Sequence, residues 1–238
     1  LLYKDNWIAF ASAFVLLFPG MFVDSSRRGM VDIPVAFFVA LAFYAFFKAR
    51  EIKPWYLVFG LATAGAILSK SVLGLFPLTI VGAFLIFSQQ WREIINPWFL
   101  SGCMIALFFG FSWHIINWQH YGQGFINAHF GSLIINRSFG GVKEPFYFLG
   151  YAKDFLRNYW PWLPFTLVGL AQFGKHGFYN EKDRTALLLF LWAVLTFLVM
   201  STSKNQTLRY LFLMFPALAI ITAKTISDWL GPDKKDRA

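Results

Sequence analysis

The sequence predicts an all-α protein whose hydrophobic helices cross a lipid bilayer as one polytopic bundle. Of the 238 residues, 58% are hydrophobic and only 14% are charged, whereas a soluble domain carries about 25% charged residues. The apolar stretches recur along the whole chain, and short polar patches separate them. This pattern is typical of a multi-span membrane protein.

Eight apolar stretches are the predicted spans. They cover residues 7–23, 33–47, 54–69, 71–88, 97–113, 159–173, 185–200 and 211–226. Several are shorter than the roughly 20 residues that cross a bilayer upright, so we expect some to be re-entrant or to extend into polar flanks. The third and fourth meet at Lys70 with almost no connection, which fits a broken hairpin. Residues 1–238 are expected to form a single integral-membrane domain.

The polar stretch SSRRGMVDIP, residues 25–34, separates the first two spans. Asp32 stands before Ile33 and Pro34, and aspartate is favoured at a helix N-cap while proline suits the first turn. A capping role alone would explain Asp32. The functional alternative is that Arg27 and Arg28 keep the carboxylate ionised and bind a phosphate, while Asp32 positions a hydroxyl or holds a metal ion.

Lys70 is an isolated cation between two apolar half-segments, in GLATAGAILSKSVLGLFPL. A charge at membrane depth is costly and tends to mark a functional site. One interpretation is that the side chain extends to the interface, as long cationic side chains do. The other is that its ammonium group faces a bound phosphate.

Residues 114–158 are the one sizeable segment between predicted spans, and we expect an extracytoplasmic loop there. Aromatic and amide side chains alternate through its first half, which favours a helix lying in the membrane interface. Gly140, Gly141 and Pro145 oppose continuation of that helix. The segment is either an ordinary connection or a lid over a lipid-facing pocket. Its histidines do not have the spacing of a zinc site.

Lysine and arginine in the short connections favour the side that carries both termini, so we expect that side to be cytoplasmic. Five cations oppose this rule, because they lie at span ends on the other side: Arg27, Arg28, Lys70, Lys204 and Arg209. A shared anionic ligand on the extracytoplasmic face would explain all five. The net charge of +9 is scattered along the chain, so lipid head groups and a phosphorylated lipid are the expected partners and nucleic acid is not.

The stretches SSRRGMVDIPVAFFVALAFYAF and WYLVFGLATAGAILSKSVLGLFPL resemble the integral-membrane glycosyltransferases of the dolichyl-phosphate-mannose protein mannosyltransferase superfamily. These proteins are GT-C-type enzymes similar to glycosyltransferase family 39, and the likeness extends to their bacterial branch, which includes the lipid A aminoarabinose transferase. The family pattern has an acidic residue at the start of a span and then a glycine-rich stretch ending in lysine, here Asp32 and Lys70. KEPFYFL, YWPWLPF and SKNQTLRYLFLMFPALAIITA resemble later family segments.

The resemblance implies inverting transfer of a sugar from a polyprenyl-phosphate donor to a lipid, glycan or protein acceptor. The reaction would take place on the extracytoplasmic face of the cell (inner) membrane. The implied phosphate ligands are Arg27, Arg28, Lys70, Arg137, Lys204 and Arg209. Asp32 is the implied carboxylate, which either orients the acceptor or coordinates a divalent metal ion.

The resemblance also places the family's principal catalytic acid in a loop upstream of the position that Leu1 matches. We therefore expect an N-terminally truncated fragment that is inactive alone. The alternative function is a transporter or flippase for a lipid-linked anion. That alternative predicts inverted repeats with paired broken helices, and the sequence shows one break, at Lys70.

Overall fold

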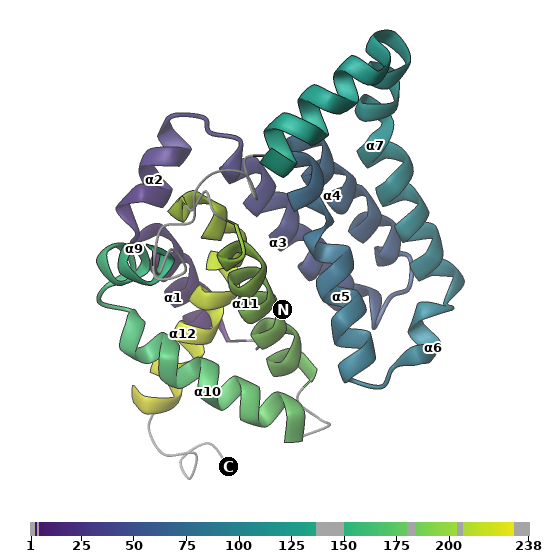
Figure 1. Ribbon diagram of the computed structural model, residues 1–238. Helices are drawn as coiled ribbons and strands as arrows, with labels where there is room; N and C mark the ends of the chain where they lie inside the picture. The colour runs from purple at the N-terminus through teal and green to yellow at the C-terminus, as the bar shows by residue number, and fades with distance from the viewer. Residues whose placement is uncertain (1–2, 4, 137–149, 180–183, 204–206, 231–238) are drawn as a thin grey trace.

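The computed structural model describes residue 3 and residues 5–136, 150–179, 184–203 and 207–230, and all of its regular structure there is helical (Figure 1). The elements are α1 Asn6–Leu17, α2 Gly20–Arg27, α3 Asp32–Ala49, α4 Trp55–Lys70, η1 Ser71–Leu75, α5 Phe76–Phe87, α6 Trp91–Ile94, α7 Pro97–Ile126, η2 Asn127–Asn136, α9 Gly150–Tyr159, α10 Leu163–Tyr179, α11 Arg184–Ser201, η4 Leu208–Met214 and α12 Phe215–Leu230.

The prediction of an all-helical membrane bundle is confirmed. Within the described residues, five helical stretches are long and apolar enough to cross a bilayer, or six if the bent pair α1 and α2 counts as one span. The two helices of that pair meet at an angle of 75°. The bend falls at Pro19, whose backbone is extended at φ −62° and ψ 108° whereas Phe18 before it is still helical. Proline has no N–H with which to continue the helix of α1.

The predicted hairpin at Lys70 is also confirmed. The residues from Trp55 to Phe87 form one apolar stretch of 33 residues, but the chain reverses direction within it. The ring of Phe84, near the end of α5, lies 5.8 Å from the ring of Phe46, near the end of α3. Phe46 also contacts Tyr56, at the start of α4. The start of α4 and the end of α5 therefore lie at the same end of the bundle.

This end, the lower one in Figure 1, is held together by a polar cluster around Glu93. The carboxylate accepts hydrogen bonds from Lys53 Nζ at 3.0 Å, Tyr56 Oη at 2.9 Å and Asn96 Nδ2 at 3.1 Å. Partial burial opposes ionisation of Glu93, but these hydrogen bonds outweigh it and lower the pKa of the carboxyl group. The cluster ties α4 to the α5–α7 connection.

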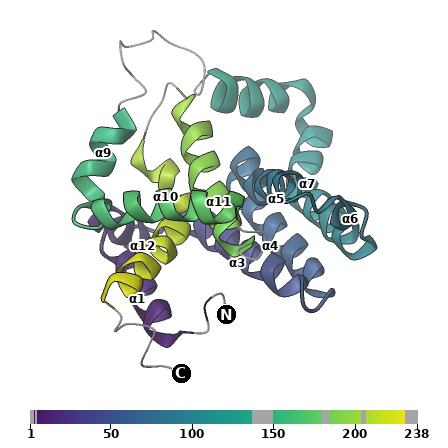
Figure 2. The ribbon, with the colours of Figure 1, turned by 90° about the horizontal axis from the view of Figure 1, so that it is seen from below.

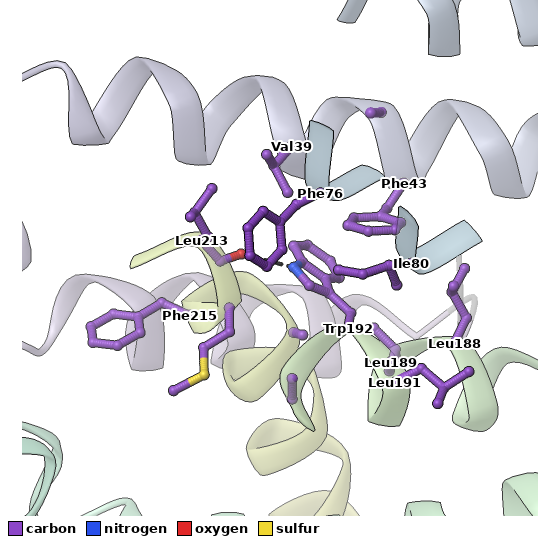
Figure 3. Packing of buried hydrophobic residues seen from close by; sticks show 14 of the residues in the cluster. Val39, Phe43, Phe76, Ile80, Leu188, Leu189, Leu191, Trp192, Leu213 and Phe215 are labelled. Atoms are coloured by element: carbon purple, nitrogen blue, oxygen red, sulfur yellow. Dashed lines mark hydrogen bonds between the residues drawn. The ribbon is translucent and has the colours of Figure 1, made fainter. Parts of the chain in front are cut away.

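The core between the two halves of the bundle is built around Trp192 of α11 (Figure 3). The indole ring lies 4.2 Å from the ring of Phe43 on α3, and its Nε1 donates to the Leu213 carbonyl at 2.8 Å. Leu213 lies in a 3₁₀ stretch, where its carbonyl would accept from residue 216. Residue 216 is proline and has no N–H, so Trp192 supplies the missing donor.

Helices α4 and α7 pack at very short range because glycines face each other. A Cβ atom on Gly60 would lie 2.3 Å from the carbonyl oxygen of Gly102, and one on Gly102 would lie 2.3 Å from that of Tyr56. Small residues allow such close approach between membrane helices. The glycine of the family-like motif in α4 therefore has a packing role, and it fixes α7 beside the helix that ends at Lys70.

The fifth predicted span ends later than expected. The sequence predicted an end at residue 113, but α7 continues to Ile126, and η2 follows it. The stretch after Trp113 contains no proline or glycine until Gly122. Gly122 then adopts φ 53° and ψ −139°, which breaks the regular helix. Figure 2 shows this part of the chain turning away from the axis of α7 and across the end of the bundle.

Candidate functional site

Asp32 and Lys70 meet at the end of the bundle opposite Glu93. Asp32 is the first residue of α3 and Lys70 the last of α4, and these antiparallel neighbours bring the two side chains together as an ion pair. The Asp32 side chain is 8% exposed and that of Lys70 is 20% exposed. Lys70 therefore turns inward to a carboxylate instead of extending to the interface.

The capping interpretation of Asp32 does not describe the structure. Val31 is the N-cap residue of α3, and no side chain caps that helix end. Asp32 lies one position later, where the helix dipole still favours a negative charge. Its carboxylate is left to pair with Lys70.

Two residues at the start of η4, which is distant in sequence from α3 and α4, also lie at this site. Lys70 Nζ lies 4.5 Å from the centre of the Tyr210 ring, a cation–π contact. Arg209 Nη1 lies 2.7 Å from the thioether sulfur of Met30, two residues before Asp32. Lys70 and Arg209, which the sequence groups on one side of the membrane, therefore lie at the same end of the bundle: Lys70 pairs with Asp32, and Arg209 contacts the side chain of Met30.

The other predicted cations differ in their placement. Arg28 forms an exposed ion pair with Asp24 at 3.0 Å, one turn earlier in α2, and does not contact Asp32. Arg27 is exposed at the last position of α2. Arg27 ends α2 and Arg28 begins the short connection that also carries Met30. Arg137 and Lys204 lie outside the described residues.

Sequence reasoning missed a polar cluster beside Lys70. Ser71 Oγ lies 2.9 Å from Nε2 of His114 and 2.9 Å from Nε2 of His129. The histidines are 43 and 58 residues further along the chain, so no local spacing could reveal the contact. The only local signal was the position of Ser71 beside an isolated membrane lysine.

The arrangement suits binding of an anion better than binding of a metal ion. Two cations, Lys70 and Arg209, lie at the end of the bundle that carries Asp32, and the Lys70 ammonium group, already paired with Asp32, competes with any metal for that carboxylate. In the described part of the chain, no three histidine, cysteine or acidic side chains lie together as metal ligands would. The donor set at Asp32 therefore does not fit a metal site, and we assign no chemical step to one.

Comparison with known proteins gives a consistent result. Residues 2–116 match the family of dolichyl-phosphate-mannose-protein mannosyltransferases. The chain is 24% identical to an undecaprenyl phosphate-alpha-4-amino-4-deoxy-L-arabinose arabinosyl transferase of Sodalis glossinidius, over 94% of this chain and 41% of that protein. It is 32% identical to dolichyl-phosphate-mannose--protein mannosyltransferase 1 of Candida albicans, over 52% of this chain and 17% of that protein.

The fold is also that of a solved structure. The crystal structure of ArnT from Cupriavidus metallidurans bound to undecaprenyl phosphate superposes with a TM-score of 0.79, at 17% sequence identity. The match covers 97% of this chain and 42% of ArnT. The chain thus spans about two fifths of the length of the Sodalis protein and of ArnT.

Proposed function

We propose that this multi-pass membrane protein, whose residues 2–116 match the dolichyl-phosphate-mannose-protein mannosyltransferase family and whose fold is that of ArnT, belongs to an enzyme that transfers a sugar from a polyprenyl-phosphate donor. The acceptor is a lipid, glycan or protein on the extracytoplasmic face, and the enzyme inverts the anomeric carbon. The observation that carries the proposal is the convergence of Lys70, Asp32 and Arg209 at one end of the bundle.

The chemistry of the reaction explains this set of residues. The acceptor oxygen attacks the anomeric carbon, the bond from that carbon to the phosphate oxygen breaks, and the lipid phosphate leaves with the bonding electrons. Negative charge therefore grows on the phosphate in the transition state, and fixed cations stabilise it there. Lys70 and Arg209 are the proposed inner ligands of the phosphate.

Four further cations are proposed to complete the phosphate site. Arg27 and Arg28 lie at the end of α2, close in the chain to Met30, where exposed guanidinium groups can reach a lipid head group. Arg137 and Lys204 are assigned to the same role on the family resemblance alone. The end of the bundle that carries these cations is assigned to the extracytoplasmic face, because Lys53 and the other cations of the short connections favour the opposite face as the cytoplasmic one.

Asp32 is the proposed orienting carboxylate. It is held by Lys70 and is ready to accept a hydrogen bond from an acceptor hydroxyl or a sugar hydroxyl. The resemblance gives the role of principal base, which takes the acceptor proton, to an acidic loop that these residues do not include. We therefore propose that these 238 residues alone do not transfer sugar.

The test uses the full protein that contains this segment, purified and reconstituted in vesicles with a radiolabelled undecaprenyl-phosphate sugar. Lys70→Ala is expected to lower transfer by about 100-fold or more, the usual effect of removing one group that stabilises a developing oxyanion. Lys53→Ala, which removes a cation at the opposite end, is the matched control and should keep transfer near the wild-type rate. Flux of the labelled lipid across the vesicle without a new sugar bond would support the transporter alternative and refute the enzyme.

A further inference from the structure

The backbone at Ser71 is held in a conformation that serine rarely adopts. Ser71 directly follows Lys70 and has φ 46° and ψ −119°. An L-residue with positive φ is uncommon outside the left-handed helical region, and it persists only where the surroundings fix it. Here the surroundings are two histidines that bind the Ser71 side chain.

The hydrogen bonds at Ser71 constrain all three partners. A hydroxyl group donates one proton and accepts at two lone pairs, and a neutral imidazole donates from one nitrogen and accepts at the other. With Nε2 of both rings at 2.9 Å, Ser71 can donate to at most one histidine. At least one histidine must therefore donate its Nε2–H to Ser71. The contact joins η1, α7 and η2 at one atom.

Aromatic packing keeps the histidine rings in place. The His129 ring stacks on Phe125 at 5.2 Å with an angle of 11° between the planes, and it lies 5.6 Å from Trp113. The His114 ring lies 5.1 Å from that of His129, and His114 is buried. Both rings therefore have few alternative rotamers, which makes the serine contact a rigid one.

We propose that Ser71, His114 and His129 form a latch that positions Lys70 to bind the lipid phosphate. The latch anchors the residue next to Lys70, so it sets where the lysine side chain leaves the end of α4. His129 belongs to η2, and η2 therefore acts on the phosphate site through Ser71. This inference rests on the proposed function, and it makes the two histidines and Ser71 positioning residues.

The test measures binding and turnover of the undecaprenyl-phosphate donor by the full protein in detergent. Ser71→Gly removes the hydroxyl group but suits a positive φ, so it is expected to fold normally and to bind undecaprenyl phosphate about tenfold more weakly. His129→Ala should show the same loss. His129→Gln, whose amide N–H lies near the position of Nε2, should restore binding to within about threefold of wild type.

Two controls separate positioning from simple stability. Ser69 flanks Lys70 on the other side and bonds only to the Gly65 carbonyl of its own helix among the contacts seen, so Ser69→Ala should bind like wild type. A latch that positions Lys70 should raise the KM for the donor when it is removed, and it should also lower kcat because Lys70 is proposed to stabilise the charge that grows on the phosphate. A purely structural role would instead lower the active fraction, and hence the apparent kcat, at constant KM.

Two results would overturn the inference, and they differ in meaning. If Ser71→Gly and His129→Ala both bind undecaprenyl phosphate within twofold of wild type while Lys70→Ala does not bind it, the latch is wrong and the phosphate site stands. If Lys70→Ala also binds normally, the phosphate site itself is wrong, and the latch has no role to serve.

Discussion

The ion pair between Asp32 and Lys70 predicts that the two single variants lose different amounts of folding free energy and that their effects are not additive. Lys70→Met leaves a carboxylate that is only 8% exposed without its partner. Removing one member of a buried pair costs about 3–5 kcal/mol of folding free energy. We expect a value near the lower end, about 3 kcal/mol, because the Lys70 side chain is 20% exposed. Asp32→Asn leaves an ammonium group that is 20% exposed.

That ammonium group can extend toward the interface, and asparagine still offers it an oxygen, so Asp32→Asn should cost less, about 1.5 kcal/mol. The double variant has no buried charge left unpaired and should cost about 2 kcal/mol or less, since replacing both partners of a buried pair is often close to neutral. The expected coupling is therefore about 2.5 kcal/mol or more.

The assay is reversible denaturant unfolding in detergent micelles, followed by tryptophan fluorescence. The control cycle is Arg28→Ala with Asp24→Ala, whose side chains are 65% and 52% exposed. Such exposed pairs contribute about 0.5 kcal/mol or less. If the Asp32 and Lys70 changes proved as nearly additive as those of the control, the pair would not be the buried, mutually dependent unit that the site requires.

Three other predictions concern packing and the lower end of the bundle. Gly102→Ala would place a Cβ atom 2.3 Å from the Tyr56 carbonyl oxygen, and it should cost about 1–3 kcal/mol of folding free energy in the same unfolding assay. The control is Gly82→Ala, whose Cβ atom would have no atom within 4 Å, and it should not destabilise the protein. Trp192→Phe removes the donor to the Leu213 carbonyl and should cost about 1–3 kcal/mol; Trp229→Phe, on an exposed ring, should change stability by less than about 0.5 kcal/mol. The lowered pKa of Glu93 means that its contribution is full above the unfolded-state value of about 4.3 and is lost as the pH falls through the lower folded-state value. The stability difference between wild type and Glu93→Gln should therefore be present at pH 7 and disappear in acid, and a difference that did not change with pH would contradict this account.

Hydrophobic segments and the hairpin at Lys70 were predictable because they depend on local composition. A long apolar stretch must be helical in a membrane, where every backbone polar group needs an internal partner. The isolated charge of Lys70 likewise marked a special position without any knowledge of its partner. The end of α7 was missed because helix length there depends on the conformation of Gly122, which glycine permits but does not require.

The partners within the site were less predictable, because they depend on tertiary packing. The sequence placed Arg27 and Arg28 beside Asp32, but Arg28 instead pairs with Asp24, one helical turn away. Lys70 is 38 residues from Asp32, and only the antiparallel packing of α3 and α4 brings them together. His129 reaches Ser71 because the chain turns after α7, a feature that no helical periodicity encodes.

The short helices beside the site have a consequence for the surrounding lipid. Helix α4 has 16 residues and α5 has 12, so at 1.5 Å per residue they rise about 24 Å and 18 Å. The hydrocarbon layer of a typical bilayer is about 30 Å thick. Lipids next to this hairpin must compress to match it, which draws their phosphate groups down toward Lys70. Acyl-chain length should therefore change how readily a lipid phosphate group reaches Lys70, with thinner membranes favouring the contact.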